Sequence, residues 1–193
     1  MTDINEHVRR SGATTPSTSS ALNKAARKDA RSDAALLELA ELLFFAYRDF
    51  TREPDKILAE IGFGRAHHRV LHFVNRHAGL RVADLLEILK ITKQSLGRVL
   101  KQLVDEGYIE QQAGKTDRRE RLLTTTPRGR ELAERLARPQ LERIARALEA
   151  SGAESRFHVG NFLSEMISQA DRTQVSQLLK AGVAARGTSG EPT

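Results

Sequence analysis

The hydrophobic pattern is most informative between Ile91 and Arg130, where it changes from helical to extended and back to helical. After Thr92, whose hydroxyl can cap a helix, apolar residues recur at the 3, 4 and 7 spacing of one helical face. They are Leu96, Val99, Leu100 and Leu103. The helix is predicted to end at Glu106-Gly107, because glycine readily adopts the left-handed conformation that closes a helix. Its opposite face is polar or small and carries three positive charges.

A basic β-hairpin is predicted after this helix. An extended run starts at Tyr108-Ile109, residues 114–117 form the turn, and residues 122–125 form the returning strand. Six Lys/Arg residues lie between Gly114 and Arg130, at positions 115, 118, 119, 121, 128 and 130. A basic hairpin beside a basic-faced helix suits duplex DNA, since a helix fits the major groove and a projecting hairpin can reach an adjacent minor groove.

Two helices are predicted upstream of Thr92. The first spans residues 64–76 and the second is a short helix over residues 82–89. The second is separated from the helix at Thr92 by a turn of a few residues, which makes a helix-turn-helix. The side chains expected to fill the angle between its helices are Leu85, Leu89, Ile91 and Leu96.

The flanking segments are predicted to be helices with unusually wide apolar surfaces. The first runs from Ser32 or Asp33 to about Thr51, and Pro54 is expected to break the chain before a linker or single turn at residues 57–61. A helix this apolar needs more than one packing partner. A subunit interface is favoured because a similar excess occurs near the C-terminus, and a central core helix of a monomer is the alternative.

The C-terminal half is predicted to be helical as well. Thr126-Pro127 starts a helix with proline at its first position, where the missing amide costs nothing. Pro139 is expected to kink or split this helix, and a last helix is predicted from about residue 153 to about residue 180. Residues 1–31 are predicted to be a disordered basic tail, and residues 182–193 a disordered C-terminal tail.

The composition and charge of the chain limit the classes of function that it can have. The net charge of +6 and the pI near 10.0 favour a polyanionic partner. The sequence has no cysteine, which excludes disulfides and thiolate zinc sites. It contains neither a long apolar run nor an apolar leader, so a cytoplasmic protein is expected. No nucleophile elbow, phosphate-binding glycine loop or metal-ligand framework is found, so neither an enzyme nor a cofactor is predicted.

The helix-turn-helix and hairpin, together with DRR at residues 117–119 and LLTTTPRGRE at residues 122–131, closely resemble the MarR family of winged-helix transcription regulators. Asp117 and Arg119 match the family's Asp-x-Arg at the tip of the wing. The family's return into the following helix is matched at Thr126, Pro127 and Gly129. The resemblance covers roughly residues 34–180.

One position departs from the family pattern. Thr125 stands where leucine is usual, which is expected to weaken the packing of the strand without touching DNA-reading positions. The segments GFGRAHHRVLHFV and ITKQSLGRVLKQLVDEGYIEQ are also similar to the PetP-type proteobacterial subgroup of the family.

The resemblance implies a mainly α fold with a small β-hairpin wing, that is, a winged helix-turn-helix with N- and C-terminal dimerisation helices. The domain would span residues 32–181, with dimerisation helices at 32–53 and 131–181 and a DNA-binding lobe at 64–130. The implied function is a homodimeric repressor or activator that binds a palindromic operator in double-stranded DNA. A small-molecule effector is compatible with the resemblance.

The recognition helix supplies the first set of DNA-binding candidates. They are Lys93, Gln94, Ser95, Arg98 and Lys101. Gln94 can bond adenine and Arg98 can bond guanine, each through two hydrogen bonds, whereas Lys101 is expected at a phosphate. Gly97 would allow a close approach to DNA or to a neighbouring helix.

The wing supplies the second set. Arg119 is predicted to enter the minor groove, and Lys115 and Arg118 to contact phosphates, with Arg121 as a further DNA-binding candidate. Asp117 is predicted to hold Arg119 or Arg121 by a charge-assisted hydrogen bond and so to stabilise the wing. For both basic surfaces, a solvated charged face is the alternative.

Four histidines crowd residues 67–77, and His68 and His72 can share one helical face. No metal site is predicted, because no cysteine supports one and no carboxylate lies between the pair as in a metalloprotease helix. Partly buried or interface histidines are expected, with phosphate contact from Arg65 or His67 as an alternative. The candidate ligand pocket consists of Phe44, Tyr47, Arg48, His68 and His72, for which core or interface packing is the alternative.

A second function is compatible with the same pattern. The helix and wing could serve a protein partner in a winged-helix interaction module without sequence-specific DNA readout. Steep salt dependence of binding to one palindromic duplex would distinguish the regulator from this module.

Overall fold

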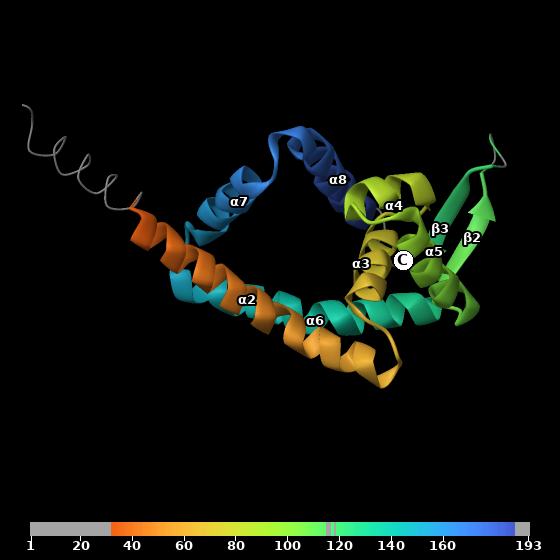
Figure 1. The fold of residues 1–193 in the computed structure, drawn as a ribbon, viewed down its shortest axis with the longest axis horizontal. Helices are drawn as coiled ribbons and strands as arrows, with labels where there is room; N and C mark the ends of the chain where they lie inside the picture. Colours follow the sequence, from red (N-terminus) through yellow and green to blue (C-terminus); the bar gives the residue numbers. More distant parts are fainter. Residues whose placement is uncertain (1–31, 115–116, 118, 188–193) are drawn as a thin grey trace, which may run out of the picture. The chain divides into compact units, whose positions relative to one another are not determined.

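The computed structural model describes residues 32–114, 117 and 119–187, with side chains up to residue 182. The predicted tail 1–31, residues 188–193, Lys115 and Arg118 lie outside the described residues. The chain divides into two units, Met1–Tyr47 and Arg48–Thr193. Figure 1 labels the helices and the longer strands. Within the described residues, no helix is long and apolar enough to cross a membrane.

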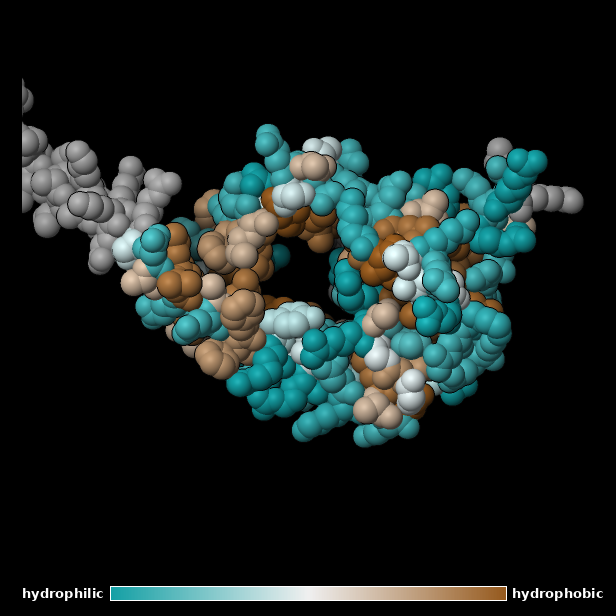
Figure 2. Space-filling model, viewed as in Figure 1, coloured by the Kyte–Doolittle hydropathy of each residue, from teal (hydrophilic) through white to brown (hydrophobic). Residues whose placement is uncertain are grey.

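The first helix, α2 (Asp33–Glu60), begins at Ser32, whose Oγ accepts the Ala35 N–H at 3.3 Å. In the first unit, the large apolar side chains of α2 are 41–72% exposed. They are Leu36, Leu37, Leu39, Leu42, Leu43, Phe44, Phe45 and Tyr47. The surface of this stretch is accordingly apolar over much of its area (Figure 2).

The predicted break at Pro54 and the linker at residues 57–61 were wrong, because α2 continues through Pro54 to Glu60. Pro54 lacks an N–H, so the carbonyl of Phe50 loses its helical donor. Gln140 Nε2 replaces that donor, lying 3.3 Å from the Phe50 oxygen. Pro54 is also fully buried. Tertiary contacts therefore offset the cost that the sequence pattern assigned to the proline.

The helix-turn-helix is confirmed. It consists of α4 (Val82–Leu89) and α5 (Lys93–Asp105), and α3 (Arg65–Arg76) packs against both. The residues of these helices buried in the core are Val70, Leu71, Val74, Leu85, Leu89, Leu96, Leu100 and Leu103, with Ile91 packed against them. Lys90 permits the tight turn after α4 by adopting the left-handed conformation, with φ of 52°.

Both predicted ends of α5 are confirmed. At its start, Thr92 Oγ1 accepts the Ser95 N–H at 3.1 Å. At its end, Gly107 is left-handed with φ of +74°, and the Tyr108 N–H reaches back to the Leu103 carbonyl at 2.8 Å. These bonds satisfy backbone groups that every helix leaves unpaired at its ends.

The predicted hairpin forms from β2 (Ile109–Ala113) and β3 (Arg121–Thr125), but the sheet has a third strand that the sequence pattern missed. This strand, β1 (Leu80–Arg81), pairs antiparallel with β3 and gives the order β1-β3-β2. A strand of two residues is too short to show a period-2 pattern.

Thr125, the departure from the family pattern, has a specific partner. Its Oγ1 donates to Asn75 Oδ1 on α3 at 3.2 Å. The hydroxyl is therefore satisfied against the helix that β3 covers.

The next helix, α6 (Pro127–Ser151), starts as predicted, with Thr126 Oγ1 accepting the Gly129 N–H at 3.0 Å. It is one continuous helix, so the predicted split at Pro139 does not occur. Gly129 lies where backbones nearly touch, because a Cβ built there would lie 2.0 Å from the Tyr108 carbonyl oxygen. Only glycine fits this approach of α6 to the start of the wing.

The single last helix predicted over residues 153–180 was wrong. The chain forms α7 (Ser155–Met166) and α8 (Gln169–Gly187), separated by an extended Ile167. Ser168 begins α8, with its Oγ 2.9 Å from Asp171 Oδ2. Ser-x-x-Asp is a helix-start signature that the continuous apolar pattern concealed. Because α8 extends to Gly187, the predicted tail was also wrong for residues 182–187.

Among the described residues, α8 contacts α4 and Lys90, the residue that follows it. Lys90 Nζ lies 3.1 Å from Asp171 Oδ1, and Gln174 Nε2 donates to Glu87 Oε2 at 3.1 Å. The C-terminal helix thus lies against the first helix of the helix-turn-helix.

Replacing Gly129 tests the close approach at the start of α6. Gly129→Ala is expected to lower the free energy of unfolding by about 1–3 kcal/mol, because the methyl group must displace backbone. Gly97→Ala is the matched control, since a Cβ at exposed Gly97 meets no atom within 4 Å. It is expected to raise stability by up to about 1 kcal/mol through helix propensity. Chemical denaturation measures both, and equal effects would contradict the close approach.

Candidate nucleic-acid interface

The polar face of α5 is open to solvent. Lys93, Gln94, Arg98 and Lys101 are exposed, whereas the apolar face of the same helix is buried. The predicted DNA-reading positions therefore share the outer face of the second helix of the helix-turn-helix.

Two of the predicted residues are engaged within the protein. Ser95 is half-buried, and its Oγ accepts the hydroxyl of Thr92 at 2.9 Å. Lys101 forms an ion pair with Asp105 one turn further along α5. Any contact of these two side chains with DNA must compete with a bond already formed in the protein.

The described part of the wing loop is held by backbone hydrogen bonds. The Gly114 N–H donates to the Glu120 carbonyl at 3.1 Å, and the Glu120 N–H donates to the Asp117 carbonyl at 3.1 Å. Asp117 Oδ1 accepts the backbone N–H of Arg119 at 2.8 Å. The bond found for this carboxylate is thus to the backbone of Arg119, where the sequence predicted one to an arginine side chain. Arg119 and Arg121 are exposed.

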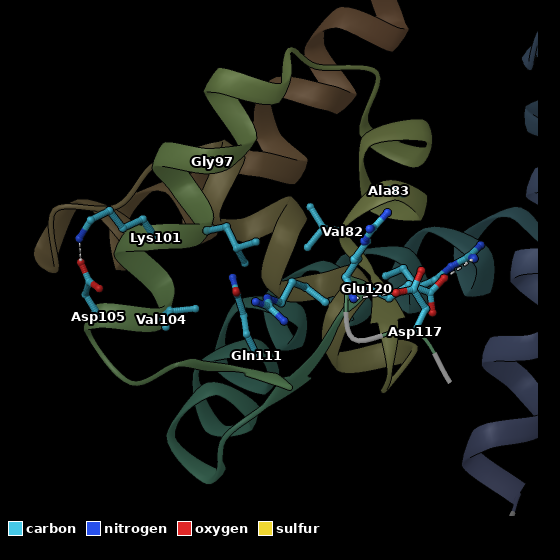
Figure 3. Close-up of a pocket in the computed structure, with 13 residues that line it drawn as sticks. Val82, Ala83, Gly97, Lys101, Val104, Asp105, Gln111, Asp117 and Glu120 are labelled. Carbon is cyan, nitrogen blue, oxygen red and sulfur yellow. Dashed lines mark hydrogen bonds and ion pairs between the residues drawn. The ribbon is translucent and has the colours of Figure 1, made fainter. Parts of the chain in front are cut away.

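A groove of about 660 Å³ lies between α5, the start of α4 and the wing (Figure 3). It brings together four of the predicted site residues, namely Lys101, Asp117, Arg119 and Arg121. Its other lining residues are Arg81, Val82, Ala83, Gly97, Leu100, Val104, Asp105, Gln111 and Glu120. The open side of Gly97 faces this groove, so among the described residues Gly97 makes no close approach to a neighbouring helix.

A chain of hydrogen bonds that the sequence did not predict ties α5 to α3. His67 Nδ1 lies 3.1 Å from the Gly64 N, which donates to it, and His67 Nε2 lies 2.9 Å from Gln102 Oε1. Gln102 Nε2 then donates to Glu106 Oε1 at 3.0 Å. The His67 ring also stacks on Phe63, with centroids 4.5 Å apart. His67 and Gln102 are 35 residues apart, so no local spacing reveals the pair.

Arg128 fastens the end of α5 from the other side. Its NH1 donates to the Glu106 carbonyl at 2.7 Å and its NH2 to the Tyr108 hydroxyl at 2.9 Å. Its guanidinium carbon also lies 4.3 Å from the Tyr108 ring centroid, a cation–π geometry. The orientation of α5 is therefore fixed at its C-terminal end by both α3 and α6.

The residues of the predicted ligand pocket are divided between the two units. Phe44 and Tyr47 belong to the first unit and are 72% and 53% exposed, whereas Arg48, His68 and His72 belong to the second. Within the second unit, a cavity of about 330 Å³ lies between α3 and α6. Its lining residues are His72, Asn75, Arg76, Ala133, Glu134, Ala137, Arg138, Leu141 and Glu142. His72 belongs to both sets.

The histidine-rich helix has structural contacts. The rings of His68 and His72 lie 6.5 Å apart, edge to face. Arg65, an alternative phosphate contact, pairs with Asp55 at 2.8 Å. No group of three or more His, Asp or Glu side chains suited to a metal ion occurs in the part of the chain that the structure describes.

The chain belongs to the MarR family. The family model described as MarR family matches residues 61–120, which span α3, the helix-turn-helix and β2. The chain is 41% identical over 150 residues to the HTH-type transcriptional regulator PetP of Rhodobacter capsulatus, covering 78% of this chain and 90% of that protein. It is therefore a member of a family of transcriptional regulators and not of enzymes.

Solved structures share the fold at lower identity. The transcriptional regulator SlyA is 18% identical with a TM-score of 0.56, covering 76% of this chain and 96% of that chain. NadR in complex with 4-hydroxyphenylacetate is 22% identical with a TM-score of 0.56, covering 64% and 88%. A mutant MarR from E. coli complexed with operator DNA is 19% identical with a TM-score of 0.53, covering 69% and 96%. The mainly helical winged-helix fold is thus confirmed.

The burial of His68 predicts that the stability of the protein depends on pH. Desolvation lowers the pKa of His68 below its ordinary value of 6.5, with Asp55 opposing the shift. The unfolded chain therefore takes up the proton more readily. The stability that this side chain contributes is complete above pH 6.5 and is lost as the pH falls below that value.

The free energy of unfolding is accordingly expected to decrease as the pH is lowered from about 7.5 to about 5.5. His68→Gln should reduce that slope, because glutamine does not titrate. His77→Gln should reduce it further, since burial also lowers the pKa of His77. Denaturant titrations across this pH range measure the slope, and an unchanged slope in His68→Gln would contradict the assignment.

Proposed function

We propose that this regulator binds a palindromic operator in double-stranded DNA as a homodimer and thereby represses or activates transcription. The observation that carries the proposal is the joint position of two basic elements. Lys101 on the exposed polar face of α5 and Arg119 and Arg121 on the wing line one groove. A helix followed by a projecting hairpin matches one major groove and the minor groove next to it.

Each residue then has a proposed role. Gln94 and Arg98 read base edges, and Lys93 contacts a nearby phosphate. Arg119 enters the minor groove, where a narrow A·T-rich segment concentrates negative potential. Arg121 contributes a further contact beside it.

The remaining candidates contact the DNA backbone. Lys101 and Ser95 would do so by exchanging their internal partners, Asp105 and Thr92. Lys115 and Arg118 remain phosphate contacts proposed from the sequence alone. Asp117 stabilises the wing by holding the backbone of Arg119.

Two relatives support this proposal. The relative of 41% identity is named an HTH-type transcriptional regulator. One protein that shares the fold was crystallised with operator DNA.

A homodimer is supported by apolar side chains at the surface. Those of α6, α7 and α8 that are 45–64% exposed in the single chain are Leu141, Ile144, Phe157, Val159, Phe162, Leu163, Met166 and Leu179. An apolar surface of this kind is characteristic of subunit interfaces. We accordingly assign dimerisation to residues 32–53 and 131–181 and DNA binding to residues 64–130, within a domain of residues 32–181. Residues 1–31 are proposed to be a basic tail outside this domain.

A small-molecule effector is compatible with the cavity between α3 and α6. Its volume of about 330 Å³ is at the lower end of ordinary ligand pockets. NadR, which shares the fold, was crystallised with 4-hydroxyphenylacetate. A ligand in this cavity would contact the helix that holds α5 through His67.

Substitution at the wing tests the DNA-binding proposal. Arg119→Ala is expected to weaken binding to the duplex that the protein selects from a random-sequence library by about tenfold or more, because a minor-groove cation is lost. Arg135→Ala, which removes an exposed arginine from α6, is the matched control and should leave affinity nearly unchanged. Fluorescence anisotropy at several salt concentrations measures both.

The wing assignment fails if Arg119→Ala binds this duplex as tightly as the native protein does. If the native protein selects no duplex, or if its binding to DNA is insensitive to salt, the winged-helix interaction module becomes the better explanation.

A charge placed on α7 tests the homodimer. Leu163→Glu is expected to weaken self-association at least about tenfold, because a carboxylate would have to be buried in the interface. Ser164→Glu adds the same charge at the next exposed position and is the control. Sedimentation equilibrium measures the dissociation constant, and a dimer unaffected by Leu163→Glu would exclude this surface.

A further inference from the structure

Arg81 lies at the base of the wing, although no basic motif of the wing or recognition helix includes it. It ends β1, where it pairs with Leu122 of β3, and it is also the N-cap residue of α4. Its backbone therefore belongs at once to the sheet that carries the wing and to the first helix of the helix-turn-helix. Contacts of its side chain therefore affect the junction between the sheet and α4.

The guanidinium of Arg81 is shared between two carboxylates. Its Nε and NH2 donate to the two oxygens of Asp84 at 2.8 and 2.6 Å, and its NH1 donates to Glu120 Oε1 at 3.2 Å. The bonds from Arg81 to Asp84 hold the pKa of the Asp84 carboxyl below its ordinary value. A planar guanidinium can serve two carboxylates in fixed directions, which the single ammonium of lysine cannot do in the same geometry.

Glu120 occupies the closing position of the wing loop. Its carbonyl accepts the Gly114 N–H at 3.1 Å and its N–H donates to the Asp117 carbonyl at 3.1 Å. Gly114 is buried against it, because a Cβ built on Gly114 would lie 2.6 Å from the Asp117 carbonyl oxygen and 3.2 Å from Glu120 Cβ. A contact that restrains the Glu120 side chain therefore also restrains the turn that contains Arg119. Figure 3 shows Glu120 and Asp117 side by side at the wing end of the groove.

We propose that Arg81, bridging Asp84 and Glu120, is a positioning residue that fixes the wing relative to the helix-turn-helix and so sets which base pairs the wing can reach. Because three of its five N–H donors are bonded to carboxylates, we assign Arg81 to the wing and not to DNA. The consequence for DNA rests on the proposed function. The effect on the wing loop does not, since it is a property of the protein without DNA.

The first test measures the loop in the free protein. Arg81→Lys keeps the positive charge but cannot bridge both carboxylates, and Glu120→Gln removes the charge at the wing end of the bridge. Each is expected to speed hydrogen exchange of the Gly114 amide about two- to fivefold, the value of an exposed ion pair. The double variant should exchange no faster than the faster single variant, because both changes remove one interaction.

Glu110→Gln is the matched control. Glu110 is exposed on β2, so the variant removes one carboxylate from the wing without touching the bridge. Its Gly114 amide should exchange at the native rate. The proposal is overturned if Arg81→Lys and Glu120→Gln also exchange at the native rate, or if Glu110→Gln speeds exchange as much as they do.

The second test uses the duplex selected from a random-sequence library. Glu120→Gln and Glu110→Gln should both raise affinity for random duplex, since each removes a charge that repels phosphate. Only Glu120→Gln and Arg81→Lys should lower the ratio of selected-duplex to random-duplex affinity, by about two- to fivefold. An unchanged ratio in both would overturn the claim that the bridge sets the reach of the wing. If the variants exchange faster but the native protein selects no duplex, the proposed function is refuted and the structural role of the bridge stands.

Discussion

The geometry of the lobe depends on the junction where the end of α5, the start of β2 and the start of α6 meet. The carbonyl of Tyr108 accepts the Thr126 N–H at 3.1 Å, and Thr126 Oγ1 donates to the Gly107 carbonyl at 2.7 Å. Gly129 brings the first turn of α6 onto that same Tyr108 carbonyl. Since Ile109 follows Tyr108 and pairs with Thr125, this junction fixes both strands of the hairpin at their base. The base of the wing is therefore held against the end of α5 by hydrogen bonds and close contacts to backbone groups.

The basic surface is less positive than the count of Lys and Arg suggests. Asp105 neutralises Lys101, and Asp84 and Glu120 neutralise Arg81. Such internal pairs contribute little to stability when exposed, but they remove charge from the surface that would meet phosphate. Exposed cations outside these pairs, among the described residues, include Lys93 and Arg98 on α5 and Arg119 and Arg121 on the wing, the elements proposed to read a sequence.

The sequence predicted the elements whose signals are local. The cap at Thr92, the left-handed Gly107 and the proline at the start of α6 each act within one helical turn, and all three lie where they were expected. The prediction at Pro54 was wrong because the donor that replaces its missing N–H comes from Gln140, which is 90 residues from the acceptor Phe50. The wing itself was foreseen, but β1 exists only through its pairing with β3.

The candidate site also combines positions that local sequence signals predict with contacts between distant segments that they do not. Exposed positions on α5 follow from helical periodicity, so Gln94 and Arg98 could be placed on its outer face from the sequence. The bond between His67 and Gln102 and the division of Arg81 between two carboxylates join distant segments. Such contacts cannot be predicted from the spacing of residues along the chain. The start of α8 is different, because Ser168 and Asp171 carried a local signal that a long apolar pattern obscured.

The contacts of α8 with α4 bear on the order in which the protein folds. Gln174 and Glu87 are 87 residues apart, so their bond closes a long loop, whereas the helix-turn-helix and hairpin close short ones. Loop closure costs more conformational entropy as the loop lengthens. During synthesis the lobe also leaves the ribosome before α8 does, and domains fold as they emerge. The helix-turn-helix and hairpin are therefore expected to assemble first, and α8 to dock on a surface that α4 has already formed.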